Sequence, residues 1–379
     1  MTHRERVLAA LRHEEPDRVP IDLGGTLAST IVGSAYPRLR EALGLAGHEA
    51  KTTWTYASLA EIEEDVRQAL DLDIVHAPRA AGAGASARQL GPDRFIDEWS
   101  VQWHKPEGGH YYVEHAPFEE EATVAAVERH PWPEPKDLVN LDGFGEWLRR
   151  MRRETDYAIS LEIRGRVMSM GQFLRGFENW MMDLADNHAF VEALLEQTTR
   201  IQMAINATVL AEAGDLVDII YTSDDLGSQN GTLCSPATFR KLFRPCFAKI
   251  WEQARRSSPA CLAHHCCGSI RPLIGEMVEL GVQVLNPIQV SAADMDPAEL
   301  KKQFGRELAF WGGVDTGYVM PRGSVEEVRS EVRRRIREMG LGGGYLCAAV
   351  HNIQPEVPPA NILAMFEEAK AFGRYPIGQ

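Results

Sequence analysis

Eight short apolar segments, most of them separated by helical patterns, constrain the fold of this chain more than any other feature. They lie at 18–24, 73–77, 158–163, 217–222, 260–263, 282–285, 308–311 and 345–350. Strands that alternate with helices indicate a parallel sheet. Eight of them predict an α/β fold, a (β/α)8 TIM barrel forming one domain over residues 1–379. Residues 93–118 depart from this pattern, because aromatic residues alternate there around Pro106–Gly109, which predicts a β-hairpin insertion.

Most of the predicted strands end in polar side chains. Residues at or just past a strand end are Asp22, Asp224, Asp225, His265, Cys267, Gln289, Asp315 and His351. In barrels of this kind the active site lies at the carboxyl ends of the strands. We therefore expect these side chains to surround a single site at one mouth of the barrel.

The fifth predicted strand carries the densest group of metal-ligand side chains. Two histidines and two cysteines occupy positions 264–267, and Gly268 follows them. Alternate residues of an extended segment share a face, so His265 and Cys267 should point together, and the residues between them away. An imidazole and a thiolate on one face make half of a zinc site. The alternative is a buried strand end whose cysteines pack as small apolar residues.

A further ligand has to come from another strand end. His351, which follows the eighth strand, is the best candidate, and Cys347 within that strand is the second, although alternation could bury it in the barrel wall. A set of His265, Cys267 and His351 would leave one zinc position open for substrate, which is the catalytic arrangement. The alternative for His351 is a solvated histidine in a loop.

Asp224 and Asp225 are two adjacent carboxylates after an apolar strand. At a barrel mouth they could act in catalysis, by orienting a ligand histidine or by accepting a substrate proton. A structural role is equally compatible with the sequence, since aspartate also favours turns and the first position of a helix.

Six further residues are candidates for contact with substrate: Asp22, Trp103, Tyr221, Asn286, Gln289 and Asp315. Asn286 and Gln289 carry neutral donors and acceptors, but turn formation around Pro287 would also explain them. Asp315 is either a site residue or the cap of a short turn. Trp103 belongs to an aromatic group that could cover the mouth or simply pack within the hairpin.

Composition excludes several classes of partner. The formal net charge of −14 argues against binding to nucleic acid or to an anionic membrane surface. No segment approaches the roughly 18 apolar residues of a spanning helix, and Met1–Val7 lacks an apolar signal-peptide core. The six cysteines show no disulfide-scaffold spacing. We therefore expect a cytoplasmic protein with reduced thiols.

Motifs along nearly the whole chain resemble those of the uroporphyrinogen decarboxylase superfamily. They are Arg4–His13, Pro16–Pro20, Cys267–Gly268, Gly312–Asp315, Gly342–Tyr345 and the closing group Pro355, Pro358 and Asn361. The resemblance implies the barrel, a homodimer, and one of two broad activities. The decarboxylases of this superfamily carry an arginine-rich segment after the first strand, which holds the carboxylates of a tetrapyrrole. Here the corresponding stretch, residues 21–30, contains no arginine.

The methyltransferase branch of the superfamily, which looks like the methylcobalamin:coenzyme M enzymes, binds zinc through a His-x-Cys pair and a late cysteine. His265 and Cys267 match the pair, whereas His351 stands at the late position. The resemblance therefore implies a zinc-dependent methyltransferase that moves a methyl group between a corrinoid (cobalamin) protein and a small thiol or a methoxylated or methylated compound.

Two other functions remain open. A decarboxylase acting on a carboxylated tetrapyrrole would need no metal, but would need Asp22 or Asp73 near the pyrrole nitrogens and a basic pocket, which the sequence does not locate. A non-catalytic scaffold that binds zinc or a corrinoid protein would show no turnover. A neighbouring gene for a small corrinoid-binding protein would favour methyl transfer.

Overall fold

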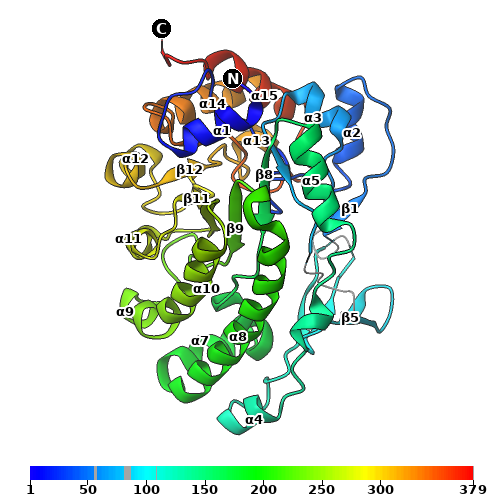
Figure 1. The fold of residues 1–379 in the computed structure, drawn as a ribbon, viewed down its shortest axis with the longest axis vertical. Coiled ribbons are helices and arrows are strands. Elements are labelled where there is room, and N and C mark those ends of the chain that lie inside the picture. Colours follow the sequence, from blue (N-terminus) through cyan, green and yellow to red (C-terminus); the bar gives the residue numbers. More distant parts are fainter. Residues whose placement is uncertain (55–57, 81–86, 108, 379) are drawn as a thin grey trace.

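The computed structural model describes residues 1–54, 58–80, 87–107 and 109–378 (Figure 1). Its centre is a curled, parallel seven-stranded sheet whose neighbours follow chain order. The strands are β3 (Ile74–His76), β8 (Ala158–Glu162), β9 (Ile219–Ser223), β10 (Cys261–His265), β11 (Val284–Asn286), β12 (Ala309–Trp311) and β13 (Tyr345–Leu346). The prediction of a mixed α/β, barrel-like fold is therefore confirmed.

The first predicted strand, 18–24, is reduced to isolated bridges, but it lies between the two edge strands of this sheet. Ile21 pairs in parallel with Cys347, next to β13. On the other side, the backbone N–H of Asp73 donates to the carbonyl of Ile21. The chain at Ile21 thus joins the β13 edge to the β3 edge.

Helices follow most of the strands and pack outside them, as seen for α8, α10, α11 and α12 around β9 and β11 in Figure 1. The helices are α1 (His3–Leu11), α2 (Tyr36–Ala42), α3 (Glu64–Leu70), α4 (Val124–Arg129), α5 (Phe144–Glu154), α6 (Met168–Arg175), α7 (Phe177–Asp186), α8 (His188–Ala213), α9 (Pro236–Thr238), α10 (Arg244–Ser257), α11 (Arg271–Glu279), α12 (Pro297–Phe304), α13 (Val319–Arg322), α14 (Val325–Met339) and α15 (Pro359–Phe372). None of the described helices combines the length and apolar composition that crossing a bilayer requires.

Between β3 and β8 the chain forms a four-stranded antiparallel sheet, where a single hairpin was predicted. Its strands are β4 (Arg88–Gln89), β5 (Arg94–Ile96), β6 (Gln102–His104) and β7 (Tyr112–His115). Gly108, in the predicted turn, lies outside the described residues. A separate small ribbon pairs β1 (Thr52–Trp54) with β2 (Leu59–Ala60).

Two apolar layers hold the barrel together, because alternate strand residues face opposite sides. The outer layer packs between the strands and the helices. The inner layer fills the barrel with side chains such as Ala263 and Trp311, and Val7 and Leu11 of α1 join it. Helix α1 lies at the amino ends of the strands, where the N–H of Gly344 donates to the carbonyl of Ala10. The opposite, carboxyl ends remain available for a site.

Candidate functional site

A cavity of about 360 Å³ lies at the carboxyl ends of the strands and under the antiparallel sheet. Its wall includes residues that end or follow β3, β8, β9 and β10, together with His351 beyond β13. Six of the predicted site residues line it: Trp103, Tyr221, Asp224, Asp225, His265 and His351. Cavities of this size commonly enclose a small organic ligand.

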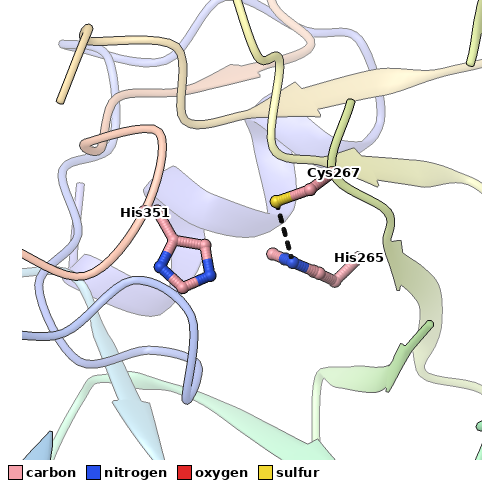
Figure 2. A group of neighbouring side chains, drawn as sticks. All are labelled: His265, Cys267 and His351. Carbon is pink, nitrogen blue, oxygen red and sulfur yellow. Dashed lines mark hydrogen bonds between the residues drawn. The ribbon is translucent and has the colours of Figure 1, made fainter. Parts of the chain in front are cut away.

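His265, Cys267 and His351 converge beside this cavity. One ligand atom from each residue lies within 4.8 Å of the others. Figure 2 shows the side chains of His265 and Cys267 near each other and that of His351 approaching from a separate loop. The His265 and His351 rings meet edge to face, with centroids 5.6 Å apart. His351, rather than Cys347, is thus the third member of the group found among the described residues.

The ligand atoms of His265 and Cys267 are spaced as in a tetrahedral zinc site. The Cys267 Sγ atom lies 3.4 Å from the His265 Nε2 atom. Zinc bonds of about 2.0–2.3 Å place two tetrahedral ligand atoms about 3.3–3.7 Å apart. Burial raises the pKa of the Cys267 thiol well above its ordinary value, and the charge of Asp225 adds to this effect. A thiolate at this position therefore requires a cation beside it.

Asn286 sets the tautomer of His265. The Asn286 Oδ1 atom lies 2.8 Å from His265 Nδ1 and also accepts from the Tyr221 hydroxyl at 3.3 Å. The Asn286 Nδ2 atom donates to the Trp311 carbonyl at 3.1 Å, which determines which end of the amide faces the histidine. Because Oδ1 can only accept, His265 Nδ1 carries the proton, and Nε2 keeps its lone pair for a metal.

The turn after His265 is held from both sides. The Asp225 Oδ1 atom accepts from the Cys267 N–H at 2.8 Å, and Gln289 Oε1 accepts from the Gly268 N–H at 2.7 Å. Gly268 has φ +88°, and a Cβ atom there would lie 2.5 Å from the carbonyl carbon of Gly227. Only glycine fits this position, and it allows the backbone to turn directly after the cysteine.

The neighbouring pair points away from the site. His264 packs edge to face against Phe247 and Trp251 of α10. Its Nδ1 atom lies 2.9 Å from Thr222 Oγ1. Cys266 is fully buried, and its sulfur accepts from the Leu226 N–H. Both side chains belong to the packing between strand and helix.

Several of the predicted site residues, the catalytic candidate Asp224 and four of the predicted substrate contacts, have structural partners in this fold. Asp224 accepts from the backbone N–H groups of residues 167–169 and so caps α6, the structural alternative given above. Asp22 accepts from the Gly25 N–H and from Trp311 Nε1. Asp315 lines a different cavity and accepts from the N–H groups of residues 317–319 at the start of α13. Asn286 and Gln289 hold the histidine and its turn, whereas substrate contact was predicted.

Two further residues named from the sequence are Trp103, a predicted substrate contact, and Cys347, the second candidate for the third metal ligand. Trp103 lines the cavity, and its Nε1 atom donates to Asp97 Oδ2 at 2.8 Å. Cys347 is buried in the barrel, and burial raises its pKa to about 12.

Sequence reasoning missed the basic side chains of the cavity. Arg79, Arg164 and Arg166 all line its wall. Two of them follow β8 directly, in the stretch Arg164-Gly-Arg166. In the sequence, two arginines on either side of a glycine directly after a predicted buried strand were the signal for a basic wall of the cavity.

Comparison with known proteins identifies the family. The profile of the family described as uroporphyrinogen decarboxylase (URO-D) matches residues 115–372. A methyltransferase from Methanosarcina mazei has a similar structure, with a TM-score of 0.68 and 19% identity over 98% of this chain and 99% of that chain. Xylanase 10B from Thermotoga maritima gives a TM-score of only 0.40 at 12% identity, over 67% of this chain and 85% of that one. No curated protein sequence matches.

The methyltransferase comparison shows a shared fold along nearly the full length of both chains. The family profile covers more than half of the chain, including the His265–Gly268 turn and His351. This chain therefore belongs to the uroporphyrinogen decarboxylase family.

Proposed function

We propose that this protein is a zinc-dependent methyltransferase that moves a methyl group between a corrinoid protein and a small thiol or a methoxylated or methylated substrate. The observation that carries the proposal is the convergence of His265, Cys267 and His351 next to the cavity at the carboxyl ends of the strands. Family membership and the fold shared with a methyltransferase support it.

The protein's own groups would prepare this site for metal and substrate. Asn286 holds His265 with Nε2 unprotonated. Burial lowers the pKa of His351 to about 4, so its imidazole is neutral near pH 7. Three protein ligands leave one position open for a substrate atom. A zinc ion bound there would supply Lewis acidity, which lowers the pKa of a thiol or polarises a methoxy oxygen.

The aromatic wall and the antiparallel sheet would limit access of water. Trp99 and Trp103 line the cavity and are almost fully buried. Asp225 remains about half exposed, and its Oδ1 atom lies 3.8 Å from His265 Nε2. Asp225 can therefore steady the ligand turn and, in the proposal, receive a proton from substrate.

One observation favours the decarboxylase alternative, namely the three arginines of the cavity. The two carboxylates that this chemistry would use are, however, engaged elsewhere. Asp73 accepts from Arg6 and Arg18 near the amino ends of the strands. Asp22 is held by Trp311 and Gly25. We therefore place decarboxylation second.

The metal content of the purified protein tests the proposal. We expect about one zinc per chain in the wild type, and loss of zinc in His265→Ala, Cys267→Ala and His351→Ala. Cys246→Ala, which removes a buried cysteine of α10 outside the cavity, is the matched control and should keep the metal. Cys347→Ala should also keep it. A wild type that binds no zinc when zinc is supplied would refute the zinc mechanism.

Turnover then separates the remaining functions. Zinc-loaded protein should transfer methyl from a methylated corrinoid to a thiol, and the histidine and cysteine variants should not. Release of CO2 from a carboxylated tetrapyrrole by metal-free protein would establish the decarboxylase. Zinc binding without any turnover in these assays would favour the scaffold.

A further inference from the structure

The turn after Cys267 is held by the β9 loop (residues 224–233) and the β11 loop (residues 287–293), which follow the two neighbours of β10 in the sheet. Besides the bonds described above, the Ser228 carbonyl of the β9 loop accepts from the Ser269 N–H at 2.8 Å. The N–H groups of three consecutive residues, 267–269, are thus each bonded to an oxygen atom of one of these loops. The position of the Cys267 sulfur therefore depends on both loops.

Gln229, at the exposed tip of the β9 loop, connects this loop to the β11 loop. Its Nε2 atom donates to the Ser291 carbonyl, and its Oε1 atom accepts from Gln289 Nε2 at 2.9 Å. Its backbone carbonyl accepts from the Ala293 N–H at 2.9 Å. Among the described residues, Gln229 lies outside the cavity wall. Its side chain therefore reaches the turn after Cys267 through Gln289.

The two ends of this chain of hydrogen bonds determine the orientation of both side-chain amides. The Ser291 carbonyl can only accept, so it requires the Nε2 end of Gln229, and the Oε1 end then faces Gln289. The Gly268 N–H can only donate, so it requires the Oε1 end of Gln289. Turning either amide around would place donor against donor at one end and acceptor against acceptor at the other. Gln229 therefore keeps the accepting end of Gln289 on the turn.

The β9 loop has hydrogen bonds of its own, which fix the backbone that carries Gln229. The N–H and the hydroxyl of Ser228 both donate to the Gly231 carbonyl, at 2.7 and 2.9 Å. A Cβ atom at Gly227 would lie 2.8 Å from the carbonyl oxygen of Cys267, so the loop packs directly on the turn. The side chain of Gln229 is thus supported by a closed turn at a fixed place beside the metal site.

We propose that Gln229 is a positioning residue of the metal site, which acts through Gln289 to hold the turn that carries Cys267 in the geometry for binding zinc. Groups that orient a metal ligand contribute to metal affinity although they do not touch the metal. The inference deepens the proposed function and rests on it, because the zinc site is the one proposed above.

Zinc affinity, measured by competition with a chelator in a double-mutant cycle, tests the inference. We expect Gln229→Met to bind zinc about three- to tenfold more weakly than the wild type, since one hydrogen bond makes a difference of this order. Gln289→Met should lower the affinity about tenfold or more. Adding Gln229→Met to Gln289→Met should change it by less than about twofold, because the connection is already broken. Equal effects of Gln229→Met in both backgrounds, or no effect in the wild type, would overturn the inference.

Asn230→Ala is the matched control for a change at the loop tip. Asn230 is the next exposed residue, and within the described part of the chain its backbone N–H, not its side chain, makes a hydrogen bond. The zinc affinity of Asn230→Ala should equal that of the wild type within about twofold. A loss as large as that of Gln229→Met would mean that any change in the loop lowers the affinity, and would contradict a specific role of Gln229.

Amide hydrogen exchange of the metal-free protein separates this inference from the proposed function. The Gly268 amide should exchange about threefold or more faster in Gln229→Met than in the wild type and in Asn230→Ala, because its acceptor is no longer held in place. A wild type that binds no zinc while Gln229→Met shows this faster exchange would keep the hold of Gln229 on the turn and reject the zinc mechanism. Zinc binding by the wild type, with exchange and affinity both unchanged in Gln229→Met, would refute the positioning role and leave the zinc mechanism standing.

Discussion

Replacing Asn286 with leucine tests whether the environment of His265 prepares it for a metal. The Asn286 Oδ1 atom lies 2.8 Å from His265 Nδ1, and the amide is itself oriented by the Trp311 carbonyl. Leucine has a similar size but cannot accept a hydrogen bond. Removing a partner that orients a histidine ligand typically lowers metal affinity 10–100-fold, which is about 1.4–2.7 kcal/mol. Because the amide is anchored and buried, we expect the upper half of this range for Asn286→Leu.

The measurement is a competition for zinc between the protein and a chelator, with circular dichroism of the metal-free protein to verify folding. Tyr221→Phe is the matched control. It removes the 3.3 Å bond from the tyrosine hydroxyl to the same Oδ1 atom, together with the hydrogen bond of that hydroxyl with Thr26, and leaves the bond to His265. We expect the zinc affinity of Tyr221→Phe to change by less than about threefold. If Asn286→Leu binds zinc as tightly as the wild type while His265→Ala does not bind it, the orienting role of Asn286 is wrong.

Three further predictions concern stability. Gly165→Ala should lower the free energy of unfolding by about 1–3 kcal/mol in urea, because the new Cβ atom would overlap Thr222; an unchanged midpoint would contradict the packing. Asp224→Ala should lower the free energy of unfolding by at least about 2 kcal/mol, since three N–H groups at the start of α6 lose their acceptor. A smaller decrease would mean that water takes the place of the Asp224 carboxylate as their acceptor. The pKa of His3 in the folded protein is raised above the ordinary value of 6.5, mainly by the hydrogen bond to Asp73. The stability that His3 contributes is therefore complete below pH 6.5 and lost as the pH rises through the folded-state value. The free energy of unfolding of the wild type should thus exceed that of His3→Asn by on the order of 1 kcal/mol at about pH 5.5 and equal it near pH 9. A difference in unfolding free energy that does not depend on pH would refute this prediction.

The strand pattern predicted the barrel-like fold and the neighbouring placement of His265 and Cys267, because both follow from local alternation. The first strand was harder to predict. Residues 18–24 form only bridges, since their pairing with Cys347 and Asp73 depends on contacts far along the chain. Sequence alternation in 93–118 indicated antiparallel strands, but not how many.

The roles of individual polar residues could not be predicted from residue type alone. Asparagine and aspartate suit a substrate contact, a helix cap and a partner for histidine equally well. Asn286, Asp224 and Asp315 differ in role because of where Trp311, α6 and α13 lie, and the local sequence does not contain that information. Arg164 and Arg166 were overlooked for the opposite reason: the sequence shows them plainly, but only the structure shows that they line the same cavity.

The pairing of residues 19–32 with residues 347–373 affects how the protein folds during its synthesis. Ile21 pairs with Cys347, Ile31 with Ile353, and the Val19 N–H donates to Gly373. These partners are more than 300 residues apart, so residues 19–32 leave the ribosome long before their partners are synthesised. Contacts so distant in sequence form slowly, because the entropy of closing a long loop is lost before the contacts contribute any favourable free energy. We therefore expect residues 19–32 to keep unpaired backbone groups, and to be open to chaperones, until residues 347–373 have been synthesised.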